Sequence, residues 1–111
     1  MKKLKKLWPL FLSLAVLAVL IVIALSSSKV ILFYGNTCSH CKKVEEYLQS
    51  NPSKVKYRFL EVYDNKENAN LMISKAKLCG LNSDNVGIPF LYDGKKCLSG
   101  DQDIIDWFSK Q

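Results

Sequence analysis

The segment VILFYGNTCSHC, residues 30–41, decides the fold of this chain. Its first five residues are a continuous apolar run, which is typical of a β-strand covered on both faces. Residues 35–37 form a loop. From Cys38 to about Ser50 the pattern is helical, because Cys41, Val44 and Leu48 share one face and charged residues occupy the other. The segment therefore predicts a buried strand that leads into an amphipathic helix, with a cysteine pair at the junction.

The remaining residues of the C-terminal part alternate between strand and helix patterns. Strands are predicted at 55–63, 88–92 and 96–98, with an Asp93-Gly94 turn between the last two. One helix is predicted from an Asp64–Glu67 capping box to about Cys79, and another over 102–108. The order is β-α-β-α-β-β-α. We therefore expect an α/β fold with a four-stranded mixed sheet, whose first crossover is parallel and right-handed, with helices on both faces.

The N-terminal part has a different character. Residues 7–25 carry no charge over 19 positions, a length that spans a bilayer core as a helix, and four of the five residues from Lys2 to Lys6 are lysines. Trp8 suits the headgroup interface, and Pro9 lies near the start of the apolar run. We predict a single-pass anchor in the cell membrane, with the lysines cytoplasmic and the rest extracytoplasmic. A cleaved signal peptide, ending near Ala24-Leu25-Ser26, stays open as the alternative.

This division predicts residues 1–28 as the lysines, anchor and short linker, and residues 29–111 as one folded domain. The net charge of +6 is concentrated at the N-terminus, since the chain beyond its four leading lysines holds twelve basic and ten acidic residues. Such a balance argues against a nucleic-acid-binding domain. We expect a monomer, with the active site on the side of the domain away from the bilayer.

Cys38 and Cys41, with two residues between them at a strand–helix junction, predict a redox pair. Cys38 lies at the helix N-terminus, where free N–H groups and the helix dipole favour a thiolate, so we predict it to be the nucleophile. Cys41 lies one turn further on the inner face and is predicted to be the resolving cysteine. His40, when cationic, stabilises the Cys38 thiolate and makes the disulfide form more oxidising.

With these motifs the domain resembles the thioredoxin superfamily in its minimal, glutaredoxin-like form. Gly87-Ile88-Pro89 occupies the place of the family's cis-proline, which faces the active-site cysteines. Ser99-Gly100, followed by Asp101-Gln102-Asp103, falls where glutaredoxins carry a Gly-Gly pair and an acidic glutathione contact. The resemblance implies a thiol–disulfide oxidoreductase with Pro89 at the site and a substrate-binding surface made of Thr37, Ile88, Ser99 and Gly100.

The sequence departs from the glutaredoxin pattern in two places. Glutaredoxins usually have Pro-Tyr between the cysteines, whereas this chain has Ser39-His40, which resembles the periplasmic disulfide oxidases and protein disulfide isomerase. Ser99 replaces the first glycine of the pair. We therefore expect protein thiols and disulfides as substrates, an unidentified redox partner, and no cofactor beyond the cysteine pair, with a glutathione-dependent glutaredoxin as an alternative.

Two other interpretations of the cysteines stay open. In the first, the domain is a non-catalytic module that holds a metal or docks a partner, and Cys38 and Cys41 form part of a metal site or an inert bridge. A zinc site, however, would need a second Cys/His pair. Cys79 and Cys97 form either a second, structural disulfide or two buried free thiols. A disulfide requires a Cα–Cα distance of about 4.4–6.8 Å. The direction of the redox reaction is not encoded in the motif.

Overall fold

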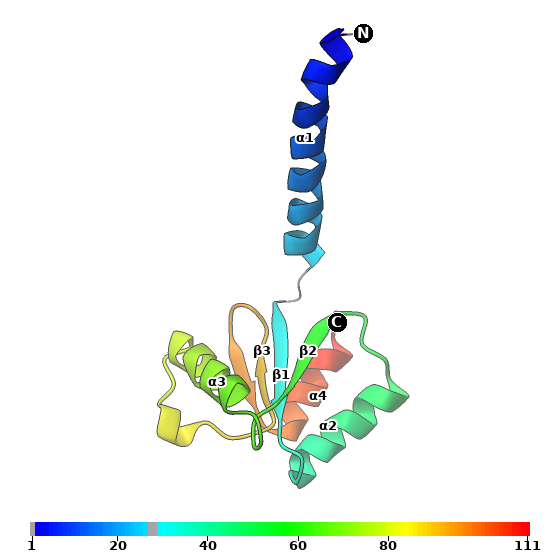
Figure 1. Ribbon diagram of the computed structural model, residues 1–111. Helices are drawn as coiled ribbons and strands as arrows, with labels where there is room; N and C mark the ends of the chain where they lie inside the picture. The colour runs from blue at the N-terminus through cyan, green and yellow to red at the C-terminus, as the bar shows by residue number, and fades with distance from the viewer. Residues whose placement is uncertain (1, 27–28) are drawn as a thin grey trace.

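The computed structural model describes residues 2–26 and 29–111 (Figure 1). Residues 27 and 28 of the predicted linker lie outside the described residues. In chain order the elements are α1 (Lys2–Ser26), β1 (Val30–Tyr34), α2 (Ser39–Ser50), β2 (Tyr57–Glu61), α3 (Lys66–Leu78), a 3-10 turn η1 (Ser83–Asn85), β3 (Phe90–Tyr92), β4 (Cys97–Ser99) and α4 (Asp101–Ser109).

Helix α1 contains the apolar N-terminal run. The stretch Lys5–Ile23 is long and apolar enough to cross a membrane, and none of it is buried against the rest of the protein. A signal sequence meets the same test. Helix α1 begins at Lys2, well before the apolar run, so Pro9 lies inside the helix and not in its first turn. Because proline has no N–H, Pro9 cannot donate to the Lys5 carbonyl.

Among the described residues, four strands form one sheet in the order β2-β1-β3-β4. β1 is parallel to β2, with Leu32 opposite Phe59, and antiparallel to β3, with Leu32 opposite Leu91. β3 and β4 form an antiparallel hairpin closed by a turn in which the Asp93 N–H donates to the Lys96 carbonyl. This confirms the predicted mixed α/β sheet.

The two faces of the sheet bury separate apolar clusters. α2 and α4 cover one face and α3 covers the other (Figure 1). Alternate residues of β1 face opposite clusters, which explains why the whole strand is apolar. The first cluster comprises Val30, Leu32, Val44, Leu48, Leu91, Ile104 and Phe108. The second comprises Ile31, Phe33, Val62, Met72, Ala76 and Phe90.

Several element boundaries differ from the prediction. β3 begins at Phe90, because the preceding Pro89 has no N–H for the ladder. The α3 N-cap is Asn65, whose side chain accepts from the Asn68 N–H, so the predicted capping box at Asp64 was wrong by one residue. The Glu61 carboxylate accepts from the backbone N–H of Asp64, which keeps Asp64 outside the helix.

Candidate active site

Cys38 caps the helix that follows β1. It is the N-cap of α2, with extended backbone angles (φ −96°, ψ 113°), and its Sγ accepts a hydrogen bond from the Cys41 N–H at 3.1 Å. The loop before it closes through the Cys38 N–H, which donates to the Gly35 carbonyl at 3.3 Å. A sulfur in this position faces free N–H groups and the positive end of the helix dipole, which favour a thiolate.

Cys38 and Cys41 are joined as a disulfide with a Cα–Cα distance of 5.2 Å. Their exposure differs: Cys41 is 2% exposed and lies on the inner face of α2, whereas Cys38 is partly exposed at the helix tip. A bulky partner molecule therefore reaches the sulfur of Cys38 more readily than that of Cys41.

The segment before β3 lies against Cys38, which brings the predicted site residues together. Cys38 Sγ lies 3.9 Å from the Ile88 carbonyl oxygen, and the Ile88–Pro89 peptide bond is cis. Pro89 is buried, and its carbonyl accepts from the Gly100 N–H at 3.0 Å. The Ser99 hydroxyl donates to the Gly87 carbonyl at 3.3 Å. The structure thus connects Ile88 and Pro89, next to Cys38, to the end of β4.

Gly35 is a site residue that the sequence analysis did not single out. A Cβ at this position would lie 2.7 Å from Ile88 Cδ1 and would also overlap the Tyr63 ring. Because Gly35 has no side chain, Tyr63 and Ile88 can pack directly against the loop that carries Cys38. The sequence signal was a glycine directly after an apolar strand, but the neighbours that require it are distant in the chain.

His40 pairs with an acidic residue instead of standing alone. Its Nδ1 lies 3.1 Å from Asp101 Oδ2, and the same oxygen lies 3.6 Å from Lys43 Nζ. The hydrogen bond with His40 is the main cause that lowers the pKa of the Asp101 carboxyl below its ordinary value. Asp101 opens α4, so this contact joins the first turns of α2 and α4. It places a negative charge beside the ring that was predicted to act on Cys38.

A hollow of about 400 Å³, the active-site hollow, opens beside Cys38. Of the four residues predicted to bind substrate, Thr37 lines this hollow, whereas Ile88, Ser99 and Gly100 are not among its lining residues. Lys42 and Glu45 of α2 also face it and place one charge of each sign there. The lining residues are Tyr34, Gly35, Asn36, Thr37, Cys38, Ser39, Lys42 and Glu45.

Cys79 and Cys97 form a second disulfide in the structure, with a Cα–Cα distance of 6.1 Å. Cys79 follows the last turn of α3 and Cys97 begins β4, where it packs against the α3-side cluster. The bridge therefore closes a segment that contains η1, Pro89 and β3. Within residues 2–26 and 29–111, no group of three or more His, Cys, Asp or Glu side chains is arranged to hold a metal ion.

No protein-family model matches the sequence, and no curated protein matches it. Solved structures do match. Glutaredoxin C1 from Populus tremula x tremuloides, in its holo form, is 20% identical with a TM-score of 0.52, over 78% of this chain and 79% of that one. A thioredoxin-like protein is 20% identical with a TM-score of 0.52, over 72% and 97% of the two chains. A glutaredoxin from Archaeoglobus fulgidus is 18% identical with a TM-score of 0.52, over 78% and 90%. At these identities the likeness establishes a thioredoxin-like fold.

Proposed function

We propose that this chain is a thiol–disulfide oxidoreductase that acts on protein cysteines from a membrane tether. One observation carries the proposal. Cys38, partly exposed, accepts the Cys41 N–H at the tip of α2, and buried Cys41 lies within disulfide distance of it. This arrangement gives one sulfur that can attack a substrate and a second that can release it.

The reaction proceeds by two thiol–disulfide exchanges. In the reduced protein, the Cys38 thiolate attacks one sulfur of a substrate disulfide, so a Cys38–substrate bond forms and the other substrate sulfur leaves as a thiolate. The Cys41 thiol then loses its proton and attacks Cys38, which forms the protein disulfide and releases the second substrate thiolate. Two electrons pass to the substrate. The reverse sequence oxidises a substrate dithiol, and the potentials of substrate and partner set the direction.

The proposed tether is supported by the length and apolar character of α1. β1 starts four residues after α1 ends, and Cys38 follows the opposite end of β1, about 17 Å further along for five residues. This order supports an active site that faces away from the membrane and reacts with soluble proteins or extramembrane domains. An extracytoplasmic domain is compatible with two disulfides, which persist in oxidising compartments.

Protein substrates are favoured over glutathione by the state of Asp101. The resemblance places an acidic glutathione contact at 101–103, but the Asp101 carboxylate is engaged by His40 and Lys43. A second partner of the same oxygen would have to displace them. We therefore expect faster exchange with a protein disulfide than with oxidised glutathione at equal concentration.

The test uses the full reduced chain in lipid nanodiscs. The wild type should reduce insulin disulfides catalytically when a reductant is supplied, and Cys38→Ala should abolish turnover, whereas Leu78→Ala on the exposed face of α3 should not. Wild-type protein without turnover on any disulfide, with or without bound metal, would favour a non-catalytic module. Carbonate-resistant membrane association, together with an N-terminus retained in the mature protein, would distinguish an anchor from a cleaved signal peptide.

A further inference from the structure

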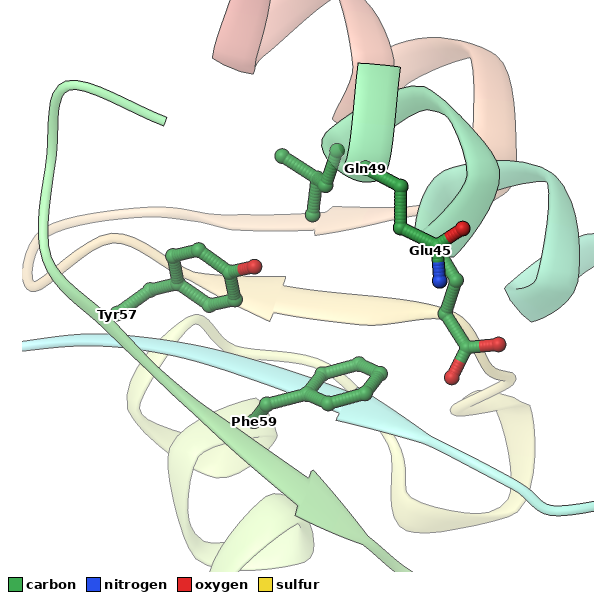
Figure 2. A pocket seen from close by; sticks show the side chains of 5 residues that line it. Glu45, Gln49, Tyr57 and Phe59 are labelled. Carbon is green, nitrogen blue, oxygen red and sulfur yellow. The ribbon is translucent and has the colours of Figure 1, made fainter. Parts of the chain in front are cut away.

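A second hollow, here called the distal hollow, lies further along the flank of α2 from Cys38. It measures about 280 Å³ and opens between α2 and the edge strand β2 (Figure 2). Its floor is apolar and aromatic, and its rim carries the polar groups of two α2 side chains. The lining residues are Glu45, Leu48, Gln49, Tyr57 and Phe59.

The two hollows are neighbours along α2, and together they are called the groove below. Glu45 lines both of them. Tyr34, which lines the active-site hollow, stacks on Phe59, which lines the distal hollow, with ring centroids 3.8 Å apart and planes at 11°. The stacked rings therefore link the hollow beside Cys38 to the distal hollow.

One aromatic residue of the groove floor packs against the core, and another is exposed to solvent. Tyr57 packs edge-on against Phe108 of the core, with ring centroids 5.2 Å apart. Phe59 is 39% exposed, and among the described residues β2 has no strand on its outer side. Tyr34 and Tyr57 both contact Phe59 and form with it a partly exposed aromatic patch, and contiguous apolar patches mark binding surfaces.

We propose that this groove, formed by Tyr34, Phe59 and the flank of α2, binds an extended segment of the substrate polypeptide and takes one aromatic or aliphatic side chain in its distal hollow. The proposal rests on the proposed function and names the substrate class of the same site. The rim favours a polypeptide over a lipid tail, because the Glu45 carboxylate and the Gln49 amide offer hydrogen bonds to a peptide backbone.

The spacing follows from the helix. From Cys38 to Glu45 and Gln49 the chain advances seven and eleven residues, about 10 and 16 Å at 1.5 Å per residue. An extended peptide covers that length in about three to five residues. The bound apolar side chain should therefore lie about four residues from the reacting substrate cysteine.

The experiment measures capture of peptides by the full Cys41→Ser chain in nanodiscs. Each peptide carries one cysteine as a mixed disulfide with thionitrobenzoate, in a Gly/Ser background, with Trp or Gly four residues away on either side. The Cys38 thiolate bonds to the peptide sulfur and thionitrobenzoate leaves as a coloured thiolate. On one side, we expect the Trp peptide to react about tenfold faster than the Gly peptide, equivalent to about 1.4 kcal/mol.

Variants then assign the preference to the groove. Phe59→Ala removes the exposed ring from the floor, and Gln49→Trp fills the distal hollow from an exposed helix position, so each should bring the Trp/Gly ratio close to one. Leu78→Ala, which removes an exposed apolar side chain from α3, should keep the tenfold ratio. Because the ratio is measured within each variant, a loss of active protein cancels.

The outcomes distinguish failure of the groove proposal from failure of the proposed oxidoreductase function. If the wild-type ratio is near one although small aromatic disulfides react with Cys38, the groove proposal is overturned and the proposed function stands. If no disulfide reacts with Cys38, both fail. A ratio that survives in both groove variants places the preference elsewhere and overturns the groove. If the wild type forms dimers and Phe59→Ala dissociates them, the groove binds a second copy of this chain. That result would also refute peptide binding.

Discussion

Replacing both Cys79 and Cys97 with alanine should lower the free energy of unfolding by about 3 kcal/mol. In the native protein both ends of the bridged segment are also held by other contacts: Cys79 follows α3, and Cys97 pairs with Tyr92 in the sheet. The folded structure should therefore survive without the bridge. The loss is expected to come from the unfolded chain, which gains the freedom that the cross-link removes.

The magnitude follows from the sequence separation of 18 residues. In the chain-entropy relation a closed loop of that size is worth about 3 kcal/mol at 25 °C. For a folded part of this size, 1 kcal/mol shifts the melting temperature by roughly 4–8 °C, so the variant should melt roughly 12–24 °C lower. The segment between the cysteines carries Pro89, so amide exchange should accelerate most over residues 80–89.

Pulse proteolysis in urea, on the full chain in nanodiscs, measures the change. The background should carry Cys38→Ala and Cys41→Ala, so that the active pair cannot exchange with the bridge. Dithiothreitol should then cost the bridged protein the same 3 kcal/mol and leave the four-alanine chain unchanged. The Leu78→Ala variant, one residue from the bridge, should lose much less.

Two results would refute the reasoning. A loss below about 1 kcal/mol would mean that the unfolded chain is not constrained by this bridge. Alkylation of both thiols in native protein isolated without reductant would mean that the bridge does not form.

Four further predictions concern the active site. Cys41→Ser should accumulate mixed disulfides on Cys38, visible on non-reducing gels; trapping that requires Cys41 but not Cys38 would reverse their roles. His40→Tyr should lower the reduction potential of the Cys38–Cys41 pair, by 30 mV for each 1.4 kcal/mol of thiolate stabilisation lost, whereas Asp101→Asn should raise it, because an anion near the thiolate disappears. Equilibration with glutathione redox buffers measures both potentials. Equal potentials in the wild type and the two variants would disprove the charge argument. The pKa of Asp101 in the folded protein lies below its ordinary value of 3.8. The ionised carboxylate therefore contributes stability that is complete above the unfolded pKa and is lost as the pH falls through the folded pKa. The stability difference between wild type and Asp101→Asn should vanish only on acidification below about pH 3.8. Gly35→Ala should destabilise the domain by about 1–3 kcal/mol through overpacking and slow Cys38 alkylation kinetics, and an unchanged melting temperature would show that the neighbouring side chains move aside without cost.

The sequence by itself determined the order of the elements, the mixed sheet and the position of the cysteine pair. These features are encoded locally. The burial of β1 on both faces needs only an unbroken apolar run, and the exposure difference between Cys38 and Cys41 follows from their places on one helical turn. The roles of the two cysteines were inferred from the same local pattern and stay predictions for the experiments above.

The tertiary structure alone decided which side chains from distant elements meet. His40 and Asp101 are 61 positions apart, and their contact depends on how α2 and α4 pack together. The overlap that Gly35 avoids involves Ile88, and the groove depends on Tyr34 stacking on Phe59. Local periodicity sets which face of an element is apolar, but not its rotation or offset against a neighbour. Those are settled only when all the apolar faces pack at once into a dense core.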